Sequence, residues 1–254
     1  MSDAVVGLLV AGLVFAGGMG SLLLYPLLPE HHLTSETRDA VRVGIGMVSI
    51  LTTLVLGLLI ASAKGTLDRA DQQVRSYAAD LILLDQTLRD YGADADPVRR
   101  MLLQYTEEVL RTTWPAKAPT EVEPLESKEF GALLDQTMRA ILALAPMNDG
   151  QLWLRNQALG VAVNLIHTRW LVLVSEAGAI SPVLLGIMIA WIFIIFASFG
   201  LNAPRNATVV ATFLLCALSI GAAIFLILEM FAPFSGFIAV SAIPMQNAFA
   251  HLSQ

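Results

Sequence analysis

Residues 54–92 have the sequence LVLGLLIASAKGTLDRADQQVRSYAADLILLDQTLRDYG, which starts without charge and becomes densely charged from Lys64 onward. The stretch has no proline, and Gly57 and Gly65 are its only glycines before Tyr91. Its apolar residues recur at spacings of three and four from the uncharged part into the charged part: Ile60, Ala63, Leu67, Ala70, Val74, Tyr77, Leu81, Leu84, Leu88 and Tyr91. This pattern predicts one rigid helix that leaves lipid, enters water and packs with the same face throughout.

The composition indicates that much of the chain is surrounded by lipid. Hydrophobic residues make up 56% of the 254 residues and charged residues 14%, with a mean hydropathy of +0.68, outside the usual range of soluble domains. The net charge of −6 argues against a nucleic-acid partner and against a polybasic contact with anionic lipid. The single cysteine, Cys216, lies in an apolar run, so we expect it to serve as a small packing residue.

Four uncharged stretches are long enough to cross about 30 Å of hydrocarbon at a rise of about 1.5 Å per residue. They cover residues 5–28, 43–63, 183–201 and 207–228. The sequence therefore predicts an all-α integral membrane protein with four transmembrane helices. The spans form two hairpins, in domains 1–63 and 183–230. A helical insert at 64–182 lies between spans two and three, and a C-terminal tail occupies 231–254.

The orientation follows from the even number of spans, which puts both termini and the insert on one side of the membrane. Near the membrane that side has four basic residues, Lys64, Arg69, Arg75 and Arg169, against Arg38, Arg42 and Arg205 on the other. The positive-inside rule then favours a cytoplasmic insert and cytoplasmic termini.

The insert is expected to be helical, with a loop or surface arm at Pro115–Glu126 that is rich in proline and acidic residues. Asp80, Asp85 and Asp90 step by five and share no helix face, which favours three solvated positions. Asp85 and Arg89, at i and i+4, are expected to form an ordinary helix pair worth a few tenths of a kcal/mol.

No motif of catalytic chemistry is present: the chain has no Gly-rich phosphate loop, CxxC, HExxH or nucleophile elbow. We therefore expect that the protein is not an enzyme and that it has no catalytic residue and no cofactor. The adjacent His31 and His32 favour an ordinary polar connection, because a metal site would need further ligands such as Glu30 or Glu36.

The spans lack ionisable residues except for Glu229 at the end of the fourth, which argues against proton relays and ion-coupled carriers. A passive pore is compatible with this composition, because it needs shape and backbone dipoles more than buried charge. Ser49, Thr52, Thr53 and Ser62 in span two either line such a pore or bond to helix carbonyls. In the first span, Gly12, Ala16 and Gly20 form a small-xxx-small row that admits another helix, from this chain or from another subunit.

Several segments resemble the bacterial bestrophin-like family of membrane proteins, and the resemblance covers nearly the whole chain from Arg42 on. They are RVGIGMVSILTTLVLGLLIASAKGTLD at 42–68, AADLILLDQTLRDYGADADPVR at 78–99, SFGLNAPRNATVVATFLLCALSIGAAIFLILEMFAPFSG at 198–236 and IPMQNAF at 243–249. The resemblance implies an anion channel with four spans and a helical cytosolic domain between spans two and three. It also implies assembly as a pentamer around a pore lined by span two.

With that layout, the candidate lining residues in span two are Ser49, Thr52, Thr53, Leu56, Gly57 and Ile60. The candidate charges at the pore mouths are Lys64, Arg205 and Glu229. Arg205 could instead anchor the second hairpin at the lipid headgroups, and Glu229 could pair with Lys64. Span two departs from the bulky, often aromatic neck of bestrophins, because it has no aromatic residue and carries Thr53, Gly57 and Ala61 on one i, i+4 row. Such a row would either widen the neck or serve close helix packing.

Two functions from different classes follow. The first is a passive, homo-oligomeric ion channel surrounded by membrane lipid, permeable to chloride or other small anions. The alternative is a non-conducting membrane scaffold or sensor whose insert binds a cytosolic partner, through the arm Pro115–Glu126.

Overall fold

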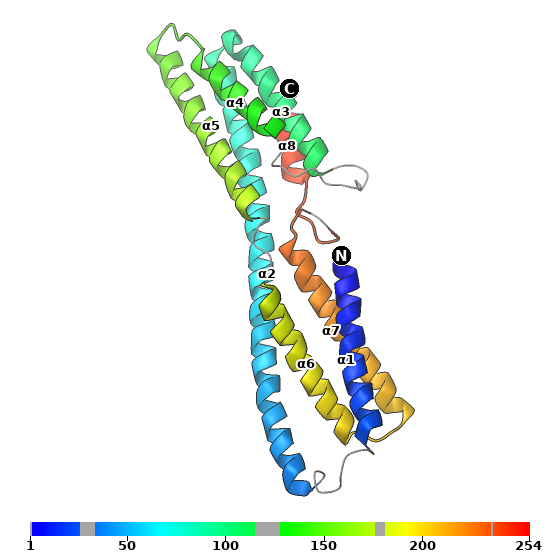
Figure 1. The fold of residues 1–254 in the computed structure, drawn as a ribbon. Helices are drawn as coiled ribbons and strands as arrows, with labels where there is room; N and C mark the ends of the chain where they lie inside the picture. Colours follow the sequence, from blue (N-terminus) through cyan, green and yellow to red (C-terminus); the bar gives the residue numbers. More distant parts are fainter. Residues whose placement is uncertain (1, 26–33, 115–127, 176–180, 235) are drawn as a thin grey trace. The chain divides into compact units, whose positions relative to one another are not determined.

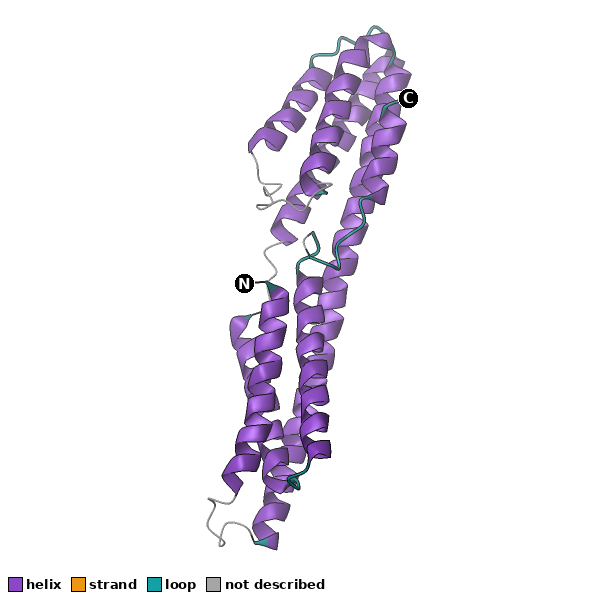
Figure 2. Ribbon diagram, turned by 90° about the vertical axis from the view of Figure 1, so that its right-hand side faces the viewer, coloured by secondary structure: helices purple, strands orange, loops and turns teal. Residues whose placement is uncertain are grey.

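The computed structural model describes residues 2–25, 34–114, 128–175, 181–234 and 236–254. Within these ranges every regular element is helical and no strand occurs, which confirms the all-α prediction (Figure 2). The helices are α1 (Asp3–Leu24), α2 (Ser35–Tyr91), α3 (Asp96–Thr113), α4 (Lys128–Leu142), α5 (Asp149–Ser175), α6 (Pro182–Asn202), α7 (Ala207–Phe231) and α8 (Ile243–Leu252), with a 3₁₀ turn η3 at Ala93–Ala95 (Figure 1). The predicted polar connection at His31–His32 and the arm Pro115–Glu126 lie outside the described residues.

The helix α2 is a single element of 57 residues, about 85 Å long at 1.5 Å per residue. It confirms the prediction that one helix carries the chain from the uncharged into the charged stretch. The helix continues because Gly57 and Gly65 are its only weak positions in the quoted stretch and no proline interrupts its hydrogen bonds. It ends at Gly92, whose φ of 113° is a conformation that favours glycine after a helix.

The chain divides into two compact units, residues 1–65 with 179–232 and residues 66–178 with 233–254. The first unit contains α1, the first part of α2, α6 and α7. In the described residues α1, α2, α6 and α7 are the helices that are long and apolar enough to cross a membrane. The core of this unit is made of Val10, Val14, Leu59, Ala63, Met188, Ile192, Phe196, Ala217, Ile224 and Ile227.

Small residues let α1 approach α6 and α7 closely in the first unit. A Cβ added at Gly7 would lie 2.8 Å from the carbonyl oxygen of Gly221, and one added at Gly17 would lie 2.7 Å from the Phe193 ring. At the start of α7, the Asn206 side chain accepts a hydrogen bond from the Val209 backbone N–H at 2.8 Å. This is the N-cap that an asparagine directly before a helix predicts.

The second unit contains the rest of α2 with α3, α4, α5 and α8. Its core includes Leu81, Leu84, Leu88, Leu102, Tyr105, Leu134, Ile141, Leu165 and Met245, each 1% exposed or less. No helix is predicted from the sequence within 231–254, yet α8 lies in this segment and buries Met245, Ala248 and Leu252. The connection before α8 is held by Trp114, whose Nε1 donates to the Val240 carbonyl oxygen at 2.9 Å.

Candidate functional site

Among the described residues, the buried positions of α2 in its membrane-spanning part lie along one narrow seam. The seam consists of Thr52 and Leu59, each 6% exposed, and Ala63, which is fully buried. In the most apolar stretch of α2 only 11% of the residues are buried, compared with 44% for α1. Because apolar side chains this exposed need lipid or protein around them, the rest of the helix surface is available to other molecules.

The side of α2 opposite this seam forms one continuous exposed stripe, which we call the open stripe. Ile50 is 71% exposed and Leu54 69% exposed. The stripe continues past Lys64 at spacings of three and four, and at about 100° per residue these positions share one face. Its members are Val43, Met47, Ile50, Leu54, Gly57, Ala61, Lys64, Asp68, Gln72, Ser76, Ala79, Leu83, Gln86 and Asp90, all of them exposed. The open stripe is apolar within the span and polar beyond it.

The predicted lining residues fall on different sides of α2. Gly57 lies on the open stripe, and the exposed Thr53 and Ile60 flank it. Thr52 is buried in the seam, and Leu56 is half-buried against the core of the first unit. Thr52 and Leu56 are therefore less accessible than Gly57, Thr53 and Ile60, and a role of any of these residues in lining a pore stays a prediction.

Three hydroxyl groups of span two bond to their own helix. Ser49 donates to the Ile45 carbonyl oxygen at 2.8 Å, Thr52 to that of Val48 at 2.7 Å and Thr53 to that of Ser49 at 2.9 Å. These bonds are the second of the two roles predicted for the three hydroxyl groups, bonding to helix carbonyls. The exposed surface of the span is therefore largely apolar, with Ser49 half-buried.

The three predicted mouth charges have different environments. Lys64 is exposed on the open stripe. Arg205 donates to the Leu22 carbonyl oxygen at 3.0 Å, and this bond satisfies a free carbonyl near the end of α1, as an anchor of the second hairpin would. Glu229 is 5% exposed on α7, and its pairing with Lys64 stays a prediction.

The row Gly12, Ala16 and Gly20 faces away from the first unit. Gly12 and Ala16 are exposed, and a Cβ added at Gly12 or Gly20 would meet no atom within 4 Å. The contacts inside the chain use the neighbouring face of α1 instead, with Gly7, Ala11 and Gly18. Contact of the row with another subunit stays a prediction.

In the second unit, Asp85 is the centre of a buried ion-pair cluster. It is 1% exposed, and Arg99 of α3 donates to it through Nε at 2.8 Å while Arg89 donates through Nη2 at 3.1 Å. The predicted helix pair between Asp85 and Arg89 is confirmed, whereas the expectation of a solvated Asp85 is wrong. Periodicity along α2 could not reveal this cluster, because its main partner comes from a helix that follows a turn.

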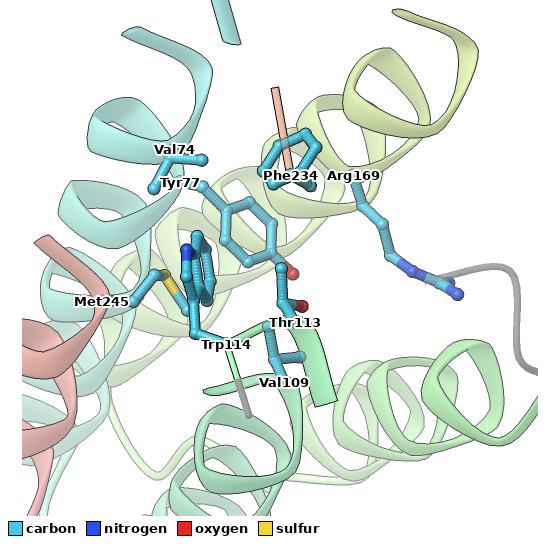
Figure 3. A pocket seen from close by; sticks show the side chains of 8 residues that line it. All are labelled: Val74, Tyr77, Val109, Thr113, Trp114, Arg169, Phe234 and Met245. Atoms are coloured by element: carbon cyan, nitrogen blue, oxygen red, sulfur yellow. The ribbon is translucent and has the colours of Figure 1, made fainter. Parts of the chain in front are cut away.

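Tyr77 of α2 and Tyr105 of α3 share a hydrogen bond between their buried hydroxyl groups. Removal from water raises the pKa of both phenols, and the mutual interaction raises the pKa of Tyr77 further. Nearby Arg169 opposes this effect more weakly. The pair sits beside an apolar gap of about 30 Å³ (Figure 3), lined by Val74, Tyr77, Val109, Thr113, Trp114, Arg169, Phe234 and Met245. This space is far below the roughly 300 Å³ of small-molecule sites, so packing rather than ligand binding explains these residues.

The tyrosine pair predicts an alkaline loss of stability. The folded state holds both protons more tightly than the unfolded chain, so stability is fully present below about pH 10, the ordinary pKa of tyrosine, and falls above it. The double variant Y77F/Y105F should lose this part of the dependence. Thermal unfolding of both proteins between pH 7 and 11 tests this expectation, and parallel curves above pH 10 would contradict it.

Comparison with known proteins supplies the family. The model of the Bestrophin-like domain matches residues 12–245, and no curated protein matches the chain. Two structures of variants of a bacterial bestrophin homologue from Klebsiella pneumoniae share this fold. One aligns with a TM-score of 0.69 at 14% identity over 99% of this chain and 98% of that chain. The other has a TM-score of 0.65 at 12% identity over 98% and 99%.

A third structure, described as a membrane protein, aligns with a TM-score of 0.68 at 14% identity and covers 97% of this chain and 96% of that chain. These identities establish the shared fold, and the domain match establishes the family. Together with the four apolar helices, the match over residues 12–245 means that this chain is an integral membrane protein of the Bestrophin-like family.

Proposed function

We propose that the chain forms a passive, homo-oligomeric ion channel in which α2 of each subunit lines a central pore. The single observation that carries the proposal is the open stripe, whose residues from Val43 to Asp90 along α2 are all exposed in the part of the chain that the structure describes. In a ring of subunits this stripe would face the central pore. Its apolar part would line a narrow, dry passage inside the membrane, and its polar part would line a water-filled passage outside the membrane. The family match supports the same arrangement.

The side chains of the open stripe also predict where the pore narrows. Ile50 and Leu54 are the large side chains near its middle, and Gly57 and Ala61 follow with almost no side chain. Rings of Ile50 and Leu54 would form an apolar constriction of the kind that gates by excluding water. The aqueous passage would widen from Gly57 towards Lys64. Thr53 and Ile60 flank the stripe and would contact both the pore and the next subunit.

Anions are the proposed permeant ions, with chloride as the probe. Lys64 supplies a ring of positive charge where the apolar part of the stripe ends, and Asp68 follows one turn later. A ring of charged side chains at a pore mouth sets the sign of the ions that enter. We propose that the second unit faces the cytoplasm of a bacterial cell and that the pore crosses its inner membrane.

Current across a planar bilayer with a chloride gradient and impermeant cations tests the channel. In a Cys216→Ala background, a cysteine at Ala61, in the wide aqueous part of the proposed pore, should be modified by a charged water-soluble thiol reagent, with loss of current. The matched cysteines at Thr52 and Leu59 should leave the current unchanged, because both side chains are buried in the seam. Lys64→Gln should weaken the chloride dependence of the reversal potential, whereas Arg205→Gln removes the same charge from an anchoring position and should not.

Two outcomes would contradict this proposal. Equal modification of the stripe and seam cysteines would mean that the open stripe does not line the pore. A silent bilayer from protein shown to be folded and oligomeric, with no modification at Ala61 under any condition, would favour the scaffold instead.

A further inference from the structure

The segment that follows the fourth membrane helix carries no charge. From Met230 to Ala250 the sequence contains no Asp, Glu, Lys, Arg or His. The helix α7 has 25 residues and is about 38 Å long at 1.5 Å per residue, whereas the hydrocarbon core of a membrane is about 30 Å thick. The helix is therefore long enough to place its last turn, which ends at Phe231, in the headgroup layer, and the uncharged segment begins there.

A closed loop comes directly after α7. Only Ala232 separates this helix from Pro233, whose carbonyl oxygen accepts a hydrogen bond from the Val240 backbone N–H at 2.8 Å. We call residues 233–240 the exit loop, and all of them except residue 235 are described. Because its two ends are hydrogen-bonded to each other, a residue near its middle lies within about 11 Å of those ends, at no more than about 3.6 Å per residue. The covalent chain therefore keeps the exit loop near the end of the fourth span.

The base of the exit loop is fixed to the end of α3. Trp114, the residue that follows α3, donates from Nε1 to the Val240 carbonyl oxygen at 2.9 Å. Its indole also meets the Phe234 ring edge-on, with 6.1 Å between the ring centroids (Figure 3). Pro233 and Val240 are both buried. Because both ends of the exit loop are buried and hydrogen-bonded, the loop presents its middle residues in a fixed place.

The tip of the exit loop exposes a large apolar side chain. Phe237 is 88% exposed, the highest value for a large apolar side chain in the part of the chain that the structure describes. It follows Gly236, whose φ of 89° is a conformation that favours glycine and turns the chain. A single exposed apolar side chain is ordinary on a surface that faces water. This one lies at the tip of an uncharged, anchored loop beside a membrane span, where lipid is the nearest apolar medium.

We propose that the tip of the exit loop inserts into the lipid interface of the membrane that α7 crosses, with Phe237 as its anchor. Phenylalanine suits this depth, because apolar side chains at a membrane surface bury about 5–10 Å into the boundary between headgroups and acyl chains. The loop has no charged residue, so the contact is with acyl chains and does not require anionic lipid. Through Trp114 the anchor ties α3 to the membrane surface. The contact needs only the membrane, so it is independent of the proposed channel.

The accessibility of a spin label to oxygen and to a nickel chelate tests the insertion. In the Cys216→Ala background, the full-length protein with a nitroxide on F237C is reconstituted into phosphatidylcholine vesicles. Oxygen concentrates in lipid and the chelate in water, so insertion raises the ratio of their collision rates with the label. M147C is the matched control, because Met147 is 87% exposed in the turn before α5. Gln151 of that helix bonds to the last residue of α2, about 40 Å from Lys64 along α2.

The ratio should be higher for the label at F237C than for the label at M147C. Equal ratios at the two positions would overturn the proposal. A label at F237C that neither oxygen nor the chelate reaches would also overturn it, because protein from a second subunit would then cover the tip.

A label at A239C, another exposed position of the loop, tests whether Phe237 is the anchor. F237E puts a charge at the tip and should lower the ratio at A239C to the value of the M147C control, whereas F237L should keep it high. Both variants should keep the unfolding temperature, because the side chain at 237 is exposed. An unchanged ratio in F237E would overturn the role of Phe237. A silent bilayer with the expected ratios contradicts only the channel, and a conducting protein with equal ratios contradicts only the anchor.

Discussion

Asp85→Ala should destabilise the helical unit by about 3–5 kcal/mol, the range for breaking a buried ion pair on one side. The carboxylate is 1% exposed and neutralises Arg99, which is itself only 21% exposed. Its removal leaves the Arg99 guanidinium with a 3.7 Å contact to the half-exposed Asp96. Because Asp85 also joins α2 to α3, the loss should appear in cooperative unfolding of the unit and not only in local fraying.

Thermal unfolding of the full-length protein in detergent measures this effect, with Asp71→Ala as the matched control. Asp71 pairs with Arg75 at the same i, i+4 spacing and at 2.8 Å, but the two side chains are 35% and 64% exposed. An exposed pair of this kind contributes about 0.3–0.5 kcal/mol. Equal losses from the two substitutions would mean that burial does not set the strength of the Asp85 cluster.

Gly221→Leu should prevent α1 and α7 from packing and remove most of the folded protein. A Cβ at Gly221 would lie 2.8 Å from the Ala11 Cβ and against the carbonyl oxygen of Gly7. The backbones of the two helices would have to separate, and overpacking a tight core costs about 1–3 kcal/mol or more. The loss should be at the upper end, because backbone atoms rather than flexible side chains block the added group.

The yield of folded protein and its unfolding temperature in detergent test this prediction. Gly12→Leu makes the same substitution on α1 at a position with no atom within 4 Å. It should leave both quantities unchanged. A change in oligomer size alone in Gly12→Leu would indicate contact of the Gly12, Ala16 and Gly20 row with another subunit. Comparable yields for Gly221→Leu and Gly12→Leu would contradict close α1–α7 packing.

Periodicity and hydropathy were sufficient for the helix α2 and the helical class. Both depend on local properties: a helix needs only its own hydrogen bonds, and the absence of proline between Leu54 and Tyr91 leaves those bonds intact. The family resemblance was also visible in the sequence, since it rests on segments such as those at 42–68 and 198–236.

The sequence did not decide which face of α2 is covered by its own chain. Thr52 and Gly57 are both small and uncharged, and nothing local distinguishes their directions. Their difference depends on where α1, α6 and α7 pack, which places Thr52 in the seam and Gly57 on the open stripe. The helix α8 was missed for a related reason, because its ten residues are stabilised by burial of Met245 and Leu252 rather than by a long periodic pattern.

By itself, then, the sequence determined the apolar helices, the unbroken helix α2 and the family of this protein, because short-range hydrogen bonding and transfer from water to lipid act on each segment separately. Only the tertiary structure decided that Asp85 is buried between two arginines, that Arg205 anchors the end of α1 and that the outer face of α5 is exposed among the described residues. Each of these depends on a neighbour distant in sequence or on the absence of one, and burial is a property of the packed chain.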